Sequence, residues 1–389
     1  MSGNQQISPD QKILIERAQQ LAPKIKERAA ATAENRRPAD ESIQELIDAQ
    51  IFQMLAPKRW GGLEAPLATM MDVVETISAA CPSTGWITAF YISHNIYVSK
   101  FPLQTQEELL GPRGFVLMPG ATAPNMQARK VDGGWEVSGR ATWGSGIMHA
   151  DWVMMSGMTA DGPRGFLMPA SDVEILDVWH FAGMAGTGSN DYQADKLFVP
   201  DHRSLPSLEM HAGRTEGSSH HDNSLFHIPF LMSAYCTILP VLTGTLRGAY
   251  DAFADIMTRR VRNFTGTVVK EQPVAHLTLG EYSIAADAAS RLARDLYSWI
   301  DERVGEHRFT QEDRLFVKGQ TAFISKLCRD TVNGMMAASG ASSFHESQAL
   351  QRIWRDLNTV STHTFWDWDV AREMTGRMKL GLPVAHPLV

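Results

Sequence analysis

Apolar residues recur at intervals of three and four through the first quarter of the chain, which is the spacing of one buried stripe on a helix. The first stripe follows Ser8-Pro9-Asp10-Gln11, a capping-box sequence with proline at the first helical position. Further helices are predicted after Pro38, over 67–80 and over 84–98. Residues 1–110 are therefore expected to form an all-helical N-terminal domain.

The pattern changes at Gly111-Pro112 to short apolar runs separated by turn residues, which is typical of β-strands. Asp132-Gly133-Gly134 between two runs suits a two-residue hairpin. Residues 207–224 are polar and aperiodic, so we expect a long surface loop there and a candidate lid. Residues 111–224 are expected to form a central β-domain with this lid loop. The predicted strands are 115–118, 128–131, 135–138, 152–158, 165–168 and 195–199.

Helical spacing then returns in four long stretches, whose lengths and connections are typical of an antiparallel four-helix bundle. Pro229 and Pro240 should end or kink the first of these helices, since proline lacks an N–H and clashes in a helix interior. We expect this C-terminal bundle to cover residues 225–389. The predicted helices are 227–262, 271–304, 311–340 and 346–378.

Composition places the chain among globular proteins and argues against several functional classes. Hydrophobic residues make up 44% and charged residues 20% of the 389 positions, which is typical of folded proteins. A formal net charge of −7 and the lack of a Lys/Arg-rich stripe argue against nucleic-acid binding. We find no signal-peptide pattern and no run of about 18 apolar residues, so we expect no membrane contact and a cytoplasmic location. The three scattered cysteines suit a reducing compartment.

Two segments rich in Gly, Trp and hydroxyl residues interrupt the predicted strands, 142–152 (TWGSGIMHADW) and 179–191 (WHFAGMAGTGSND). Glycines let the main chain approach a flat ligand closely, and Ser145, Thr187 and Ser189 offer short hydrogen-bonding groups. Ordinary β-turns have a similar composition. The flanking tryptophans favour a ligand, because tryptophan is costly in a turn unless its face packs on something. We interpret the ligand as a flavin.

The order of a helical domain, a small β-domain and a helical bundle resembles the acyl-CoA dehydrogenase fold, which is mainly α with an inserted β-barrel domain. Within that superfamily, the chain more closely resembles the oxygenase components of two-component, flavin-dependent aromatic monooxygenases, known as group D. Four motifs in the right order carry the resemblance: Ser83-Thr84-Gly85-Trp86 leading to His94, Ser145-Gly146 leading to His149, Gly186-Thr187-Gly188-Ser189, and Trp354-Arg355-Asp356 leading to His363.

The chemistry differs from that of an acyl-CoA dehydrogenase at the base. Those enzymes remove an α-proton with a carboxylate, which in many members follows the Arg-Asp pair of the last helix. Here residues 357–365 contain no Asp or Glu and offer His363 instead. A neutral or protonated imidazole can donate a hydrogen bond to the C4a-peroxide that reduced flavin forms with O2, whereas an ionised carboxylate cannot. The resemblance therefore implies a monooxygenase that takes FADH2 or FMNH2 and O2.

The resemblance also assigns roles to individual residues. His363 would stand near flavin C4a, Ser145 would hydrogen-bond the N5 region, and His94 would face the substrate, so these three are the catalytic candidates. A turn hydroxyl or a satisfied structural histidine is the alternative for each. The cofactor-binding candidates are Trp143, Gly144, Ser145, Gly146, Thr187, Gly188, Ser189, Arg260 and Arg262, the two arginines because the superfamily puts a basic residue near this position on a flavin phosphate.

The predicted substrate is a small aromatic compound that binds at His94, Gly120, Ala121 and Thr122. Phenol hydroxylases of this group carry a serine near the first β-strand, and here that strand reads Gly120-Ala121-Thr122. The missing anchor, unless Thr122 replaces it, favours an indole or an indole acid over a phenol. We predict no metal site, because the histidines between 211 and 227 lack compact ligand spacing with Cys or a carboxylate.

Two other functions fit the same pattern. One is a true acyl-CoA dehydrogenase with its base relocated, for example to Glu346, and the other is a non-catalytic protein that binds flavin or an aromatic ligand. The chain has no strand–GxGxxG–helix fingerprint, so we expect a separate NAD(P)H:flavin reductase to supply the reduced flavin. By resemblance, the protein should assemble as a homotetramer.

Overall fold

The computed structural model describes residues 8–304 and 309–385. The extreme ends of the first and last predicted domains lie outside these residues. The predicted capping box is confirmed, because the Ser8 hydroxyl accepts from Gln11 N–H and the Gln11 side chain accepts from Ser8 N–H. The N-terminal helices are α1 (Pro9–Glu34), α2 (Asp40–Asp48), α3 (Leu67–Ala80), α4 (Pro82–Val98) and α5 (Leu103–Leu110).

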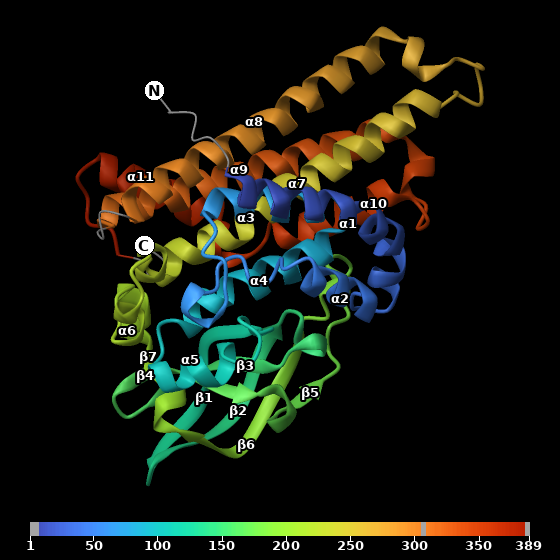
Figure 1. Ribbon diagram of the computed structural model, residues 1–389. Helices are drawn as coiled ribbons and strands as arrows, with labels where there is room; N and C mark the ends of the chain where they lie inside the picture. The colour runs from blue at the N-terminus through green and yellow to red at the C-terminus, as the bar shows by residue number, and fades with distance from the viewer. Residues whose placement is uncertain (1–7, 305–308, 386–389) are drawn as a thin grey trace.

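The central strands form one seven-stranded sheet beneath the helices (Figure 1). Its order is β5-β6-β2-β1-β3-β4-β7, with β1 and β3 parallel and the other neighbouring strands antiparallel. The edge strands β5 and β7 do not pair with each other within the described residues, so the expected barrel is an open sheet here. The strands are β1 (Gly120–Val131), β2 (Gly134–Gly144), β3 (Trp152–Thr159), β4 (Gly162–Pro169), β5 (Glu174–Leu176), β6 (Asn190–Pro200) and β7 (Ser204–Pro206).

The predicted Asp132-Gly133 hairpin is confirmed, because Val131 pairs with Gly134 across it. The expected strand at 115–118 is wrong. These residues are buried, but their N–H groups find side-chain acceptors: Asn95 Oδ1 is 2.9 Å from Val116 N, and Asp151 Oδ2 is 2.9 Å from Leu117 N. The four apolar residues correctly indicated burial. They carry no sign that side chains of α4 and of a loop, rather than a neighbouring strand, would accept from their backbone N–H groups.

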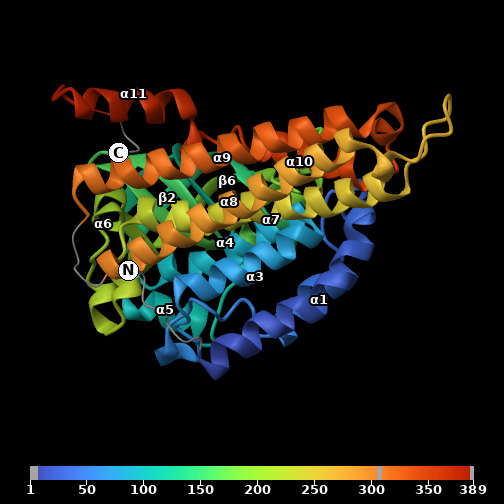
Figure 2. The same ribbon diagram turned by 90° about the horizontal axis from the view of Figure 1, so that it is seen from above.

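The C-terminal helices are α7 (Phe230–Arg259), α8 (Pro273–Val304), α9 (Gln311–Ser339), α10 (Ala349–Val360) and α11 (Trp368–Lys379). Figure 2 shows α7, α8 and α9 running side by side, with α11 outside α9 and α1 at the opposite edge. The last predicted helix, 346–378, is broken into α10 and α11 by a turn at 361–367. His363 therefore lies at the start of a short 3-10 turn rather than on a helix.

Helix α7 begins at Phe230, directly after Pro229 and three residues later than the predicted 227, and it continues through Pro240. Pro240 has no N–H to offer the carbonyl of Cys236 one turn earlier. The phenol of Tyr297 on α8 donates to that carbonyl instead. By length and composition α7 could span a membrane, but 89% of its apolar window is buried in the protein, as for the core helix of a globular domain.

The segment 207–224 lies at the surface as expected, since nine of its residues are exposed and seven buried, but it is not a plain loop: it begins with α6 (Ser207–Ala212) and contains a 3-10 turn at Gly217–His220. Lys100, fully buried after α4, donates from Nζ to the carbonyls of Gly213 and Ile228 at 2.6 and 2.9 Å. Gln106 Nε2 donates to Gly217 O at 3.3 Å. These buried donors fasten the segment to the helical domain.

Candidate functional site

A chain of hydroxyl groups joins the two Gly-rich segments to helix α4. Trp86 Nε1 on α4 donates to Ser145 Oγ over 3.0 Å. Ser145 Oγ lies 2.8 Å from Ser189 Oγ, which lies 2.6 Å from Thr187 Oγ1. Thr187 Oγ1 donates in turn to the carbonyl of Met184 at 2.8 Å. The structure therefore brings together three of the predicted site residues and adds Trp86.

The direction of this chain follows from counting protons. A carbonyl only accepts, so the Thr187 hydroxyl proton points to Met184 O, and Ser189 must donate to Thr187. Ser145 must then donate to Ser189, while its oxygen accepts from Trp86. One lone pair of Ser145 Oγ stays available. Ser145 consequently offers an acceptor to a ligand, which suits an N–H group such as N5–H of a reduced flavin.

His363 offers the opposite group. Its Nδ1 accepts from the backbone N–H of Phe365 at 3.3 Å, so the proton of the neutral ring resides on Nε2. Burial and the positive charge of Lys318 lower the pKa of His363 to about 4. The ring is half-buried, packs edge-on against Trp86 at 5.7 Å between centroids, and lines a cavity of about 240 Å³. At neutral pH it is an uncharged donor.

His94 has the other tautomer. Its Nδ1 is 2.6 Å from the carbonyl of Met118, which can only accept, so Nδ1 carries the proton and Nε2 is an acceptor. Burial lowers the pKa of His94 to about 4. The two histidines therefore present opposite hydrogen-bonding groups, although both are uncharged at pH 7.

An aromatic row on one face of α4 connects the two histidines. Trp86, Phe90 and His94 are spaced by four residues, so they lie on one side of the helix. Ring centroids are 4.9 Å apart for Trp86 and Phe90 and 5.1 Å apart for Phe90 and His94. Beyond His94 the row continues through Tyr97 to Phe230 on α7. The row thus runs from the donor His363, beside Trp86, to the acceptor His94.

The 179–191 segment is held to the bundle by the Arg355-Asp356 pair of α10. Asp356 Oδ1 accepts from Met184 N–H at 2.5 Å, and Arg355 Nη1 donates to Ala182 O at 2.9 Å. Burial raises the pKa of Asp356 to about 6. Gly183 lies so close that an added Cβ would meet the Arg355 carbonyl oxygen at 2.1 Å. The Arg355-Asp356 pair, which belongs to one of the four motifs behind the family resemblance, therefore fixes this loop to α10.

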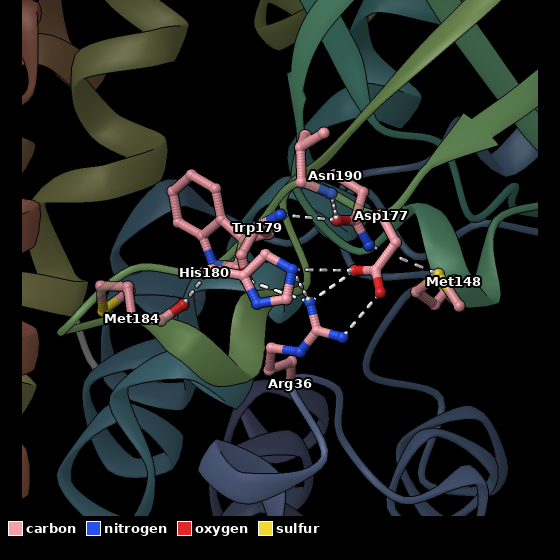
Figure 3. A network of polar contacts seen from close by, with 8 residues as sticks. Arg36, Met148, Asp177, Trp179, His180, Met184 and Asn190 are labelled. Carbon is pink, nitrogen blue, oxygen red and sulfur yellow. Dashed lines mark hydrogen bonds and ion pairs between the residues drawn. The ribbon is translucent and has the colours of Figure 1, made fainter.

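A second network holds the other end of this segment (Figure 3). Arg36, after α1, forms a two-pronged ion pair with Asp177 and also contacts the Trp179 carbonyl. Asn190 Oδ1 accepts from Trp179 N–H at 2.9 Å, and Trp179 Nε1 donates to Met184 O at 2.9 Å. Hydrogen bonds therefore hold the 179–191 segment at both of its ends.

The remaining loop candidates surround the hydroxyl chain. Trp143 is 57% exposed with φ 70°, and its ring packs against Trp179 at 5.3 Å. Gly144 pairs with Asn190, and Gly146 N–H donates to Thr187 O at 3.0 Å. Gly188 has φ 50° and closes a short 3-10 turn. An exposed aromatic ring in a left-handed conformation is a candidate surface for a flat ligand.

The two arginine candidates lie elsewhere and differ from each other. Arg260 Nη1 donates to the Ser339 carbonyl at the end of α9, 2.7 Å away, so its guanidinium is engaged within this chain. Arg262 is exposed in the turn between α7 and α8, beside Phe264, whose side chain is fully exposed. Figures 1 and 2 show this turn projecting from the body.

The substrate candidates are only partly together. Gly120 abuts His94: a Cβ there would meet the His94 ring at 3.1 Å and the Met154 methyl at 2.8 Å. Ala121 is buried, whereas Thr122 is exposed. Glu346, considered as an alternative base, is also exposed. Within residues 8–304 and 309–385 no three His, Cys, Asp or Glu side chains are grouped as for a metal.

Several functional residues were missed by sequence reasoning. Trp86 ends the motif Ser83-Thr84-Gly85-Trp86. Its spacing of four residues from Phe90 and eight from His94 could have shown that the three rings share one face of a helix. Lys318 of α9 and the Arg36–Asp177 pair carried none, because they contact the site from distant parts of the chain.

Comparisons with known proteins agree with this geometry. Residues 8–108 match the acyl-CoA dehydrogenase N-terminal domain, and 236–368 match its C-terminal domain. A pigment production hydroxylase of Rhodococcus sp. (strain ATCC 21145) is 41% identical over 97% of this chain and 98% of its own. The oxygenase subunit HsaA of a flavin-dependent monooxygenase from Rhodococcus jostii is 31% identical over 96% and 100%. The crystal structure of XiaF from Streptomyces sp., solved with FADH2 and glycerol, has a TM-score of 0.89 at 26% identity and covers 97% of both chains.

Proposed function

The chain belongs to the acyl-CoA dehydrogenase superfamily, as an oxygenase component of the two-component flavin-dependent aromatic monooxygenases, and we propose that Ser145, His363 and His94 carry its reaction. The enzyme uses reduced flavin and O2, and the flavin supplies the activation of oxygen. What these three side chains do follows from their hydrogen-bonding groups.

The observation that supports the proposal is the position of Trp86. It contacts the acceptor Ser145 of the β-domain and the donor His363 of the C-terminal bundle. Ser145 Oγ accepts from its indole N–H, and the His363 ring packs against its ring in a T-shaped arrangement. The proposed reaction needs both groups at the flavin ring: an acceptor for its N5–H and a neutral Nε2–H donor for the oxygen. The apolar row on α4 excludes water from the space beside them, which limits unproductive loss of hydrogen peroxide.

We further propose that the substrate is an indole or an indole acid. His94 Nε2 is an acceptor, so it suits a ring N–H. No second polar group stands where Gly120, Ala121 and Thr122 were expected to bind, because the first two lack one and the third is exposed. A phenol O–H could also donate to His94 Nε2, so the proposed preference for an indole rests on the missing second polar anchor and not on the tautomer of His94.

The direct experiment mixes the purified protein with NADH, flavin, O2 and a panel of indoles and phenols, with and without a generic flavin reductase. We expect hydroxylated or epoxidised product only when the reductase is present, and from indoles first. Full turnover of NADH without the reductase would contradict the two-component assignment. Product from phenols alone would contradict the proposed substrate class.

An acyl-CoA dehydrogenase activity has less support in the site. Glu346 is exposed, whereas a base that removes an α-proton is expected to be buried. His363 has a pKa of about 4, so it is a weak base. Anaerobic bleaching of bound oxidised flavin by an acyl-CoA would nonetheless establish that activity, so it is the matching control.

We also propose a homotetramer in which the α7–α8 turn reaches a neighbouring copy. Arg262 and Phe264 are exposed on this turn, and apolar Leu277 and Ile284 are 74% and 71% exposed on α8. A monomer rarely leaves such a stripe in water. The expected result is a tetrameric mass in light scattering at micromolar concentration, and Phe264→Ser with Leu277→Ser should lower it. A monomeric parent protein would contradict the proposal.

A further inference from the structure

Lys318 is a buried cation that the proposed reaction does not yet use. It lies on α9, and its side chain is fully buried. Its Nζ donates to the backbone carbonyl of Phe365 at 3.1 Å. Across the described part of the chain, no carboxylate lies within ion-pair distance of it. Burial lowers the pKa of Lys318, and the charge of Asp367, which is not in ion-pair contact, raises it in part. Burying an ammonium without a paired carboxylate is costly, so the fold gains little stability from this side chain.

The contact of Lys318 leads directly to His363. The residue whose carbonyl accepts from Lys318, Phe365, is the one whose N–H donates to His363 Nδ1 at 3.3 Å. The turn is closed further by Trp366 N–H, which donates to the carbonyl of His363 at 3.1 Å. The ammonium therefore holds the segment that fixes the imidazole tautomer.

The positive charge of Lys318 also favours the neutral form of His363. Protonation of His363 would place a hydrogen on Nδ1, facing the Phe365 N–H that now donates to it. A neighbouring ammonium opposes this second proton, and together with burial it keeps the pKa of His363 low. The other charged groups that line the His363 cavity are Lys326 and Arg329 of α9 and Asp367 and Asp369 of the following segment. Lys326 is paired with Asp330, and Asp367 caps α11.

We propose that Lys318 is a positioning residue for the reaction, which keeps His363 uncharged and protonated on Nε2 by holding the Phe365 carbonyl and repelling a second proton. This inference rests on the proposed function, because only there does the Nε2–H group act on oxygen. Lys318 itself needs no contact with flavin or substrate.

The test follows the titration of His363 by NMR in flavin-free protein labelled with [13C-ε1]histidine, with the signal assigned from its loss in His363→Gln. Lys318→Met removes both the charge and the hydrogen bond, whereas Lys318→Gln keeps a donor but no charge. Both should raise the pKa of His363 by about one unit or more, a tenfold change in proton affinity. Lys326→Met removes a charge from the same cavity without touching Phe365, and it should change the titration by much less.

The outcomes separate this inference from the proposed function. An unchanged His363 titration in folded Lys318→Met and Lys318→Gln would overturn the coupling. So would nitrogen shifts in the parent protein that place the proton of His363 on Nδ1, a measurement that needs no variant. If the titration moves as expected and product per reduced flavin at pH 5 falls about twofold in Lys318→Met relative to the parent, the positioning role is supported, because a pKa raised from about 4 to about 5 leaves half of His363 neutral at that pH. If the titration moves but product yield stays at the parent value at every pH, His363 does not act as proposed, and the coupling alone survives.

Discussion

His363→Ala is expected to lower the rate of product formation by about 10²–10³-fold. The substitution removes a neutral donor from a largely dry site, where the loss of one such donor typically costs about 2.7–4 kcal/mol. Substrate binding should change little, because His94 lies two helical turns of α4 away from the Trp86 that packs on His363. The rate is measured with reductase, O2 and substrate in excess. Thr362→Ala is the matched control, since this exposed neighbour lines the same cavity and donates only to Thr359 O.

Ser145→Ala should fail differently in the same assay. Ser145 is assigned to hold the N5 proton, and a less firmly held proton opens the route to peroxide loss. The expected observation is more hydrogen peroxide per reduced flavin consumed, with product still forming. If both variants keep the parent rate and the parent peroxide yield, these side chains are structural and the assignment of the site is wrong, although the fold is not.

Gly183→Ala is expected to weaken the binding of reduced flavin by on the order of 10²-fold. A methyl group at this position would overlap the Arg355 carbonyl and the Thr359 hydroxyl, so the loop must retreat from α10. That movement sacrifices the hydrogen bonds from Met184 N–H to Asp356 and from Arg355 to Ala182 O. Each contributes roughly 1.5–3 kcal/mol because a charged partner is involved. Anaerobic titration of reduced flavin and a thermal melt measure the effect.

Gly376→Ala in α11 is the control for this substitution. Nothing lies within 4 Å of the added methyl group, and alanine is the better helix former. Its flavin affinity should equal that of the parent protein, and its stability should be equal or slightly higher. A Gly183→Ala protein that binds reduced flavin as tightly as Gly376→Ala would show that the Arg355-Asp356 pair does not shape the site.

Local pattern was sufficient to predict much of the fold. Helix α3 falls on the predicted residues because its apolar spacing is regular and prolines bound it. The Asp132-Gly133 hairpin follows from turn chemistry alone. The break at 361–367 was missed, because Thr and His continue a helical pattern while the real partners of this turn, such as Lys318, come from another helix.

The site shows the same division. Hydroxyl and histidine candidates were recognised from their types and order along the chain, and Ser145, Thr187 and Ser189 are brought into one chain of hydrogen bonds. Their protonation states could not be predicted. The tautomer of His94 depends on the Met118 carbonyl, and that of His363 on the Phe365 N–H, both of which are backbone groups that carry no sequence signal.

The row of rings on α4 fixes the distance between the oxygen site and the substrate anchor. Trp86, where oxygen would be activated, and His94, where the substrate would be anchored, are eight residues apart, which is about 12 Å along the axis. The ring carbon that faces oxygen is then set by how far the substrate extends from its anchor. An acceptor at position 90 instead of 94 would bring the anchor about 6 Å nearer, and a different carbon of the same ring would be oxidised. The regiochemistry of such an enzyme can therefore change by a shift of one helical turn, without any change in the loops that hold the flavin.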